Sequence, residues 1–402
     1  MSSNDNRNAS SVIQSVTDVV EGTLAGAEKA GSLENSRITF RPGTRNRRYD
    51  QRSGLWNVSS LPRCRKCGRA VVGEGGLVGV RVTDGRAGFS GLASCGSVWV
   101  CPVCSIKVQA RRSLEIGCAV ATAVGRGLQV AMITLTMRHD RGQRLDMLWS
   151  ALSKSWNRVT GGTSWIAAVE RYGVHGWVRV VEVTIGDNGW HVHVHALFFG
   201  DGLTSAGLDE MAEAMFGRWS RSLQRSKLRA PLPSGQDWHL VTEAGDGSTI
   251  GDYLAKAFRE PKTAVALGAE MTLTQSKTAQ GWNKTRPVMA LLDEGALDGE
   301  VRPLRIWHEW EKGSKGRRQI AWSKGLRQEL GLIEVEKSDE EIAAEVLGSK
   351  EDTVVQITSR GYGQLVRRPK LIPDVLNGAE QLSVERFSAW LWQEGIEHRR
   401  VK

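Results

Sequence analysis

A hairpin that carries alternating histidines constrains the fold of this chain more than any other feature. Residues 178–185 alternate and are rich in β-branched side chains, and residues 190–199 form a second strand-like run. Between them lies Asp187-Asn188-Gly189. An Asn-Gly pair favours a two-residue turn because it tolerates positive φ at both central positions. The pattern predicts two antiparallel strands with residue 187 opposite residue 190.

Three histidines occupy alternate positions of the second strand. His191, His193 and His195 share one face, where residues two apart are separated by about 6.6–7 Å. The chain has only eight histidines, so this grouping is improbable by chance. The expected register places Glu182 opposite His195, and the four residues predict a His-His-carboxylate site for Mg²⁺ or Mn²⁺. The alternative is a polar, solvent-facing strand without a function.

The elements around this hairpin predict the fold class. Residues 129–137 and 238–242 read as strands, and a helix over 248–259 follows them. Further helices are expected over 145–156, 165–172 and 206–225. The order β-α-β-β-α-β-α predicts an α+β fold, a split βαβ (ferredoxin/RRM-like) antiparallel sheet with helices on one face.

Cysteine spacing predicts a second metal site. The chain has no apolar stretch that suits a secretory signal or a membrane span, so we expect a cytoplasmic protein with reduced thiols and no membrane partner. Cys64 and Cys67 form one C-x₂-C pair, and Cys101 and Cys104 form another. Four thiolates at this spacing predict a structural Zn²⁺ site. Cys95 is an alternative ligand for one of the four.

These patterns divide the chain into four predicted parts. The segment 1–50 is expected to be a disordered basic tail, and 51–120 a small zinc-binding module. The domain that carries the histidine strand is expected over 121–300. The remainder, 301–402, is expected to be mostly helical, with DNA binding as one candidate role.

The charge balance favours a polyanionic partner. The chain has 54 basic and 44 acidic residues, a net charge of +10. Two groups of arginines are predicted to contact DNA phosphates. The first is a stripe at helical spacing, formed by Arg218, Arg221 and Arg225, and its alternative is a solvated helix face. The second, Arg111 and Arg112, follows the later cysteine pair.

A tyrosine and a lysine on the last predicted helix suggest a nucleophile. Tyr253 and Lys256 are three residues apart and therefore neighbours on a helix surface. A phenol with a pKa of about 10 is a poor nucleophile at neutral pH. Its attack on a DNA phosphate needs charge neutralisation, which a metal and a lysine supply. The alternative is an ordinary half-buried tyrosine, but only this one of the four tyrosines follows the histidine strand within the predicted fold.

Together these motifs resemble the HUH endonuclease superfamily. Within it, the chain is similar to rolling-circle plasmid replication initiators with a cysteine-rich N-terminal segment. The resemblance covers roughly residues 60–260 and rests on four motifs: residues 133–136 (ITLT), His193-Val194-His195, Tyr253-x-x-Lys256, and residues 95–104 (CGSVWVCPVC). It implies divalent-metal-dependent, site- and strand-specific nicking and joining at the double-strand origin of a plasmid, where the nick site is single-stranded or a hairpin, through a 5′-phosphotyrosine intermediate. Host helicase and polymerase are then the implied partners.

The sequence departs from this family at one position and leaves other classes open. Some single-tyrosine members have a glutamate four residues before the tyrosine, where this chain has Thr249. Asp252, Asp246 or Glu243 are candidate substitutes. A conjugative relaxase or an HUH transposase is an alternative function, although a relaxase usually places its tyrosine before the histidine motif. A non-enzymatic zinc-containing DNA-binding protein is the alternative from another class.

Overall fold

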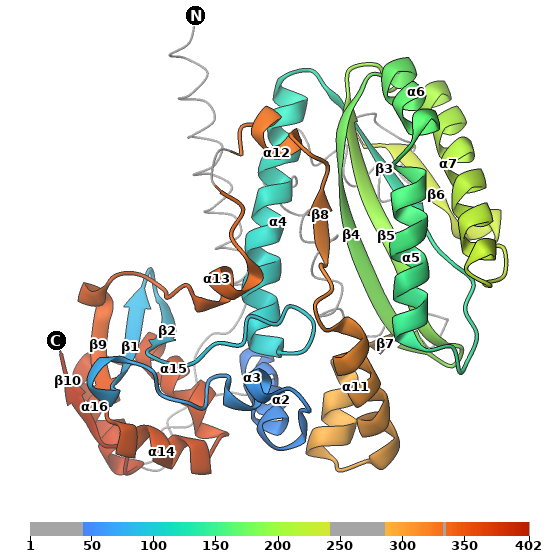
Figure 1. The fold of residues 1–402 in the computed structure, drawn as a ribbon. Helices are drawn as coiled ribbons and strands as arrows, with labels where there is room; N and C mark the ends of the chain where they lie inside the picture. Colours follow the sequence, from blue (N-terminus) through green and yellow to red (C-terminus); the bar gives the residue numbers. More distant parts are fainter. Residues whose placement is uncertain (1–42, 242–285, 333–334, 402) are drawn as a thin grey trace, which may run out of the picture. The chain divides into compact units, whose positions relative to one another are not determined.

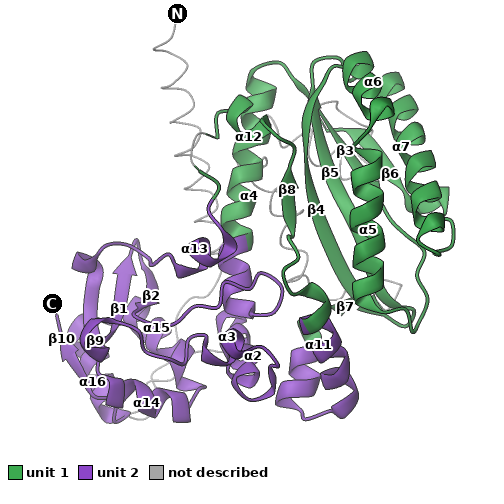
Figure 2. Cartoon of the chain, viewed as in Figure 1, with its two compact units in different colours: residues 1–26, 109–290, 312–336 green, residues 27–108, 291–311, 337–402 purple. Residues whose placement is uncertain are grey.

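The computed structural model describes residues 43–241, 286–332 and 335–401 of the chain (Figure 1). They fall into two compact units (Figure 2). Unit 1 consists of described residues within 109–290 and 312–336, and unit 2 of those within 43–108, 291–311 and 337–401. This division differs from the four consecutive domains expected from the sequence, because each unit combines segments that lie far apart in the chain.

Unit 1 is built on one antiparallel sheet. Its strands lie in the order β6-β3-β5-β4-β7, and β8 also pairs with β4. The four predicted strands therefore occur in the spatial order fourth, first, third, second, which is the split βαβ arrangement. The predicted α+β class is confirmed. The strands are β3 (Gln129–Leu135), β4 (Val174–Gly186), β5 (Gly189–Gly200), β6 (Asp237–Leu240), β7 (Arg286–Pro287) and β8 (Ile320–Trp322).

Helices cover both faces of this sheet (Figure 1). Trp156 of α5 (Leu145–Val159) and Trp165 of α6 (Thr163–Tyr172) contact Phe198 of β5. Helix α7 (Ser205–Arg225) packs beside α5 on the same side. The prediction of helices on one face is correct for these three. Helix α4 (Pro102–Gly125) was missed, and its buried residues 116–123 pack with Leu197 on the opposite face.

The hairpin between β4 and β5 forms with a different register from the one expected. Gly186 pairs with Gly189, so Asp187 and Asn188 are the two turn residues. Of the turn residues and Gly189, only Gly189 has a positive φ, at 86°. The turn expected from Asn-Gly needs positive φ at both residues, and this backbone does not provide it. Glu182 therefore lies opposite His193 rather than His195, which corrects the predicted pairing by two residues.

Unit 2 has its own sheet, in the order β10-β9-β1-β2. A two-stranded hairpin alone is marginally stable. Here β9 pairs with β1, and the core joins Val78 and Val80 of β1 to Val355 and Ile357 of β9. The strands are β1 (Val78–Thr83), β2 (Arg86–Ser90), β9 (Thr353–Ile357) and β10 (His398–Arg400). The C-terminal residues are mostly helical, as predicted, but they complete a sheet begun near residue 78.

Helix α2 (Thr44–Val58) begins inside the segment expected to be disordered up to residue 50, which corrects that boundary. Helix α13 begins with a capping box, in which Ser338 and Glu341 exchange hydrogen bonds. No described helix is both long and apolar enough to cross a membrane.

The remaining elements are α3 (Pro62–Lys66), η1 (Glu74–Gly76), η2 (Pro233–Gly235), α10 (Ala290–Leu292), η4 (Asp293–Leu297), α11 (Val301–Ser314), α12 (Leu326–Glu329), α13 (Asp339–Ala344), η5 (Lys350–Asp352), α14 (Ser359–Arg367), α15 (Leu371–Gln381) and α16 (Val384–Gln393).

Candidate metal centre

Strand β5 presents its histidines on one face of the sheet and its valines on the other. Val192 and Val194 are fully buried, because successive side chains of a strand point to opposite faces. The histidine face of β5 continues into Leu197, which packs with α4. Helices α5 to α7 cover the opposite face, as the contact of Phe198 with Trp156 shows. The histidines and these three helices therefore lie on opposite sides of the sheet.

Glu182, His193 and His195 bring their ligand atoms together. The Oε2 atom of Glu182 lies 3.0 Å from Nε2 of His193 and 3.1 Å from Nε2 of His195. The two Nε2 atoms are 3.0 Å apart, and all the ligand atoms lie within 4.8 Å of one another. A two-residue change of register keeps a side chain on its face, so Glu182 still reaches both histidines.

The carboxyl group of Glu182 is held in its ionised form. Burial raises its pKa, but hydrogen bonds and charge interactions with His193 and His195 outweigh burial and bring the pKa well below the usual range. His193 is itself buried, at 8% exposed. The group therefore offers one negative charge and two imidazole nitrogens in a site from which water is largely removed.

Thr134 orients the ring of His195. This residue of β3 lies directly opposite His195, and its Oγ1 is 3.0 Å from Nδ1 of the imidazole. When Nε2 presents its lone pair to a cation, Nδ1 carries the proton and donates it to Thr134. Such a contact fixes the tautomer and the direction of a ligating histidine. The sequence singled out residues 133–136 as a motif but assigned no role to Thr134, because that role depends on which strand pairs with β5.

His191 does not belong to this three-residue group. Its Nδ1 lies 3.0 Å from Nε2 of His139, whose own Nδ1 lies 3.0 Å from the carbonyl oxygen of Asn188. Burial lowers the pKa of His191 to about 3, with smaller contributions from His193 and His139. The carbonyl can only accept, so His139 donates to Asn188, and His191 donates to His139. His139 was missed because nothing in the sequence indicates that it lies beside the hairpin.

The predicted arginine stripe is present on α7, on the side of the sheet opposite the histidines. Arg221 and Arg225 are exposed and Arg218 is half-buried. Within the described part of the chain, none of the three forms an ion pair. The Nε and Nη1 atoms of Arg218 are buried without a hydrogen-bond partner. Burial lowers the pKa of this guanidinium, and the charge of Arg221 lowers it further.

The other predicted arginine pair is engaged within the protein. Arg112 is 6% exposed and its Nη1 lies 3.0 Å from Oε2 of Glu115. Arg111 also contacts Glu115, at 3.7 Å. The structure thus places Arg112 in a buried ion pair rather than on an exposed face where phosphates would meet it. Sequence spacing cannot distinguish such an arginine from an exposed one on the same helix.

The predicted nucleophile lies outside the part of the chain that the structure describes. Tyr253 and Lys256 lie outside the described residues, as do Glu243, Asp246 and Asp252. The helix expected over 248–259 falls in the same segment. The roles proposed for Tyr253 and Lys256 rest on the Tyr-x-x-Lys motif.

A second group contains four buried cysteines: Cys67, Cys95, Cys101 and Cys104. Cys95 takes the place expected for Cys64, which is buried but lies outside the group. The group that the structure brings together differs from the predicted ligand set at this one position. Cys118 is half-buried on α4.

Comparisons with known proteins match a segment of the chain that contains most of these two groups of residues. Residues 93–202 match a family described as "Replication protein", a segment that contains Glu182, His193, His195 and three of the four clustered cysteines. The chain is 30% identical over 359 residues to "Protein rep" of Streptomyces lividans, covering 72% of this chain and 76% of that protein.

A second relative is matched over a shorter region. The chain is 32% identical over 156 residues to "Neomycin resistance protein" of Streptomyces cyanogenus, covering 33% of this chain and 36% of that protein. The chain thus spans about a third of this relative. No solved structure shows a significant match.

Proposed function

The chain belongs to the Rep family of replication proteins, and from this premise we propose that it initiates rolling-circle replication of a plasmid by nicking and rejoining one strand of origin DNA. The observation that carries the proposal is the convergence of Glu182, His193 and His195 on one face of the sheet. A replication protein with no catalytic role would not need a carboxylate and two imidazoles directed at one point.

The donor set fits a divalent cation. Octahedral coordination at about 2.1 Å places neighbouring ligand atoms about 3.0 Å apart, and the three separations here are 3.0, 3.0 and 3.1 Å. One carboxylate oxygen and two imidazole nitrogens suit Mg²⁺ or Mn²⁺ when phosphate oxygens complete the coordination. Bound there, the ion would neutralise charge on the scissile phosphate. Glu182, His193 and His195 would hold it, and Thr134 would keep His195 in the required orientation.

We assign the nucleophile to Tyr253 on the strength of its motif. Its oxygen would form a bond to the phosphorus and lose its proton to solvent or a nearby base. The bond from phosphorus to the 3′ oxygen would break, and that oxygen would leave as a protonated 3′-hydroxyl. The 5′-phosphotyrosine keeps the energy of the phosphodiester for rejoining. Lys256 would balance phosphate charge, a host polymerase would extend the free 3′-hydroxyl, and a host helicase would separate the strands.

Mapping the covalent product tests this function. The full chain is incubated with Mn²⁺ and a labelled single-stranded origin oligonucleotide, then digested and examined by mass spectrometry. We expect the nucleotide adduct on the peptide that contains Tyr253, and no adduct in the Tyr253→Phe protein. Cleavage by the Tyr253→Phe protein at the parent rate, or an adduct on another residue, would remove Tyr253 from the mechanism.

The stripe on α7 supports a second DNA contact, which we place on duplex DNA outside the nick site. Arg218, Arg221 and Arg225 lack acidic partners within the described residues, and Arg158 of α5 lies beside them, where it donates to Ser222. A helix is about 10–12 Å thick, so a strand bound at the histidine face cannot reach this side of the sheet with the same few nucleotides. Phosphates of a flanking duplex segment are the partner that fits the uncompensated charge.

The Arg221→Glu, Arg225→Glu double variant should separate these two modes of DNA binding. We expect binding to duplex origin DNA to weaken at least about tenfold and its log–log salt slope to fall by about 2, roughly 0.9 for each phosphate that an arginine no longer neutralises. Cleavage of a short single-stranded oligonucleotide should stay at the parent rate. Arg171→Glu is the control, because Arg171 is already paired with Glu210. Equal losses on both substrates would argue against a separate duplex contact.

A further inference from the structure

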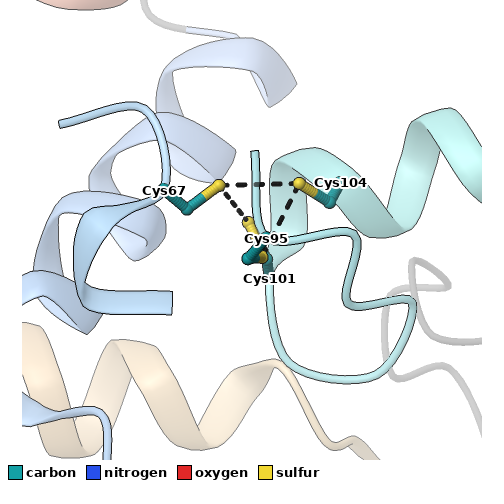
Figure 3. A group of neighbouring side chains, drawn as sticks. All are labelled: Cys67, Cys95, Cys101 and Cys104. Carbon is teal, nitrogen blue, oxygen red and sulfur yellow. Dashed lines mark hydrogen bonds between the residues drawn. The ribbon is translucent and has the colours of Figure 1, made fainter. Parts of the chain in front are cut away.

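The four clustered cysteines of unit 2 point their sulfur atoms toward one another (Figure 3). Cys67 follows α3, Cys95 and Cys101 lie in the loop before α4, and Cys104 lies in the first turn of α4. The Sγ atom of Cys67 is 3.7 Å from that of Cys101 and 3.5 Å from that of Cys104. The sulfur atoms of Cys95 and Cys104 are 3.7 Å apart.

These separations match a metal tetrathiolate. Tetrahedral coordination with Zn–S bonds of about 2.3 Å places the sulfur atoms about 3.8 Å apart. A disulfide would bring two of them to about 2.05 Å, which none of the three distances approaches. All four side chains are at most 3% exposed, as in a closed structural site rather than a catalytic one that keeps a position open.

A buried arginine next to the cluster needs an anion. Arg52 of α2 is 4% exposed, and its Nε and Nη2 atoms have no hydrogen-bond partner. Burying a charge without an opposite charge is very costly, yet no carboxylate pairs with Arg52 in the described part of the chain. Four thiolates around one Zn²⁺ carry a net charge of −2, and this cluster would provide the missing counter-charge.

We propose that Cys67, Cys95, Cys101 and Cys104 bind one Zn²⁺ ion and that Arg52 is the buried counter-charge of this zinc tetrathiolate. The assignment does not depend on the nicking function, because both the ligands and Arg52 belong to unit 2. It differs from the set expected from sequence spacing, in which Cys64 is a ligand and Cys95 is not.

The guanidinium of Arg52 is fixed against the backbone that carries Cys67. Gly68 has φ +60°, and a Cβ atom there would lie 2.2 Å from Nη1 of Arg52. Only glycine, which has no Cβ atom, leaves room for the guanidinium at this position. Tyr49 stacks on the guanidinium, with Cζ 4.4 Å from the ring centroid. Burial acts to lower the pKa of Arg52, but Tyr49, Tyr362, Cys67 and Cys101 more than offset it, and the pKa is raised.

Two further side chains hold the Cys67-Gly68 backbone in place. The indole Nε1 of Trp56 donates to the carbonyl of Cys67 at 2.9 Å, and the hydroxyl of Tyr362 donates to the carbonyl of Gly68 at 2.6 Å. Trp56 belongs to α2 and Tyr362 to α14. The zinc site would therefore fasten the start of unit 2 to its C-terminal helices, and binding of the metal would be coupled to folding of the unit.

Two serine variants of the full chain test the ligand set. Zinc content is measured by elemental analysis after dialysis, and Co²⁺ substitution reports the ligand types through its absorption bands. We expect one zinc per chain in the Cys64→Ser protein, with a Co²⁺ spectrum of four thiolates like that of the parent. Cys95→Ser should lose the zinc or show an altered spectrum. Loss of zinc in Cys64→Ser, or a parent chain without zinc, would overturn the assignment.

Replacing Arg52 tests the counter-charge. In the Arg52→Met protein, we expect transfer of zinc to a coloured chelator to be at least about tenfold faster than in the parent, the scale seen for partners of metal ligands. Arg52→Lys should restore much of the parent rate. Arg69→Met is the control, because Arg69 lies over the same Trp56 ring but is exposed. Equal release rates in the Arg52→Met and Arg69→Met proteins would show that Arg52 does not stabilise the site.

Discussion

Glu182→Gln, His193→Ala and His195→Ala proteins should each cleave origin DNA at least about 100-fold more slowly than the parent in Mn²⁺. Each substitution removes one of three ligand atoms that lie 3.0–3.1 Å apart. Under the proposed function, the remaining two would hold a cation too weakly to neutralise the scissile phosphate, a contribution worth several kcal/mol in metal-dependent catalysis. Nicking of supercoiled origin plasmid and calorimetric titration with Mn²⁺ measure the two effects on the same proteins.

Substitutions of residues next to the three ligands should weaken metal binding to different extents. Thr134→Val removes the acceptor of the His195 Nδ1 proton and should weaken Mn²⁺ binding by about 10–100-fold, whereas Thr134→Ser keeps the hydroxyl and the affinity. His191→Ala changes the same strand and face but leaves the three ligands in place, so its loss of metal affinity should be under about tenfold. If His191→Ala abolished binding and His193→Ala did not, the ligand assignment would be wrong.

Glu115→Ala should cost about 3–5 kcal/mol in the free energy of unfolding of unit 1. The Oε2 atom of Glu115 lies 3.0 Å from both Arg112 and Arg327. The side chain of Arg112 is 7% exposed and that of Glu115 10%. The other carboxylate near Arg112 is that of Glu336, at 3.6 Å, and its side chain is 42% exposed. Removing Glu115 therefore takes the buried carboxylate away from both arginines, and breaking a buried ion pair is strongly destabilising. Urea denaturation followed by tryptophan fluorescence measures the change.

Glu210→Ala provides the comparison for this prediction. Glu210 pairs with Arg171, but both side chains are more than half exposed, so the loss should be under about 1 kcal/mol. A similar small change in Glu115→Ala would mean that Arg112 finds solvent or another partner. That result would also restore Arg112 as a candidate phosphate contact.

The hairpin shows why the candidate site was predictable even though its register was not. The alternation of His191, His193 and His195 fixes their common face whatever the pairing. A shift of two residues keeps Glu182 on that face, so the three-residue group survives an incorrect turn assignment. The turn depends on backbone angles at Asp187 and Asn188, and residue type alone does not determine them.

The features of the fold and the sites that the sequence did not predict depend on contacts between segments far apart in the chain. Thr134 acquires a role only because β3 pairs with β5. Cys95 joins the cluster because of the path that the loop before α4 takes. Sequence spacing does not show which four of the five buried cysteines lie together. Arg52 belongs by sequence to an arginine-rich stretch, and only its burial against Gly68 distinguishes it from a solvated side chain. Strand β9 pairs with β1 because both carry buried valines, a pairing with no local signal.

The interleaving of the two units has a consequence for how the chain is made. Synthesis proceeds from the N-terminus, and domains usually fold as they emerge from the ribosome. Strands β1 and β2 are translated long before β9 and β10, their partners in the same sheet. Unit 2 therefore cannot complete its sheet until the whole of unit 1 has been translated, since unit 1 ends at Glu336 and β9 begins at Thr353. A zinc ion captured early by the cysteines would protect the nascent chain from oxidation during that delay.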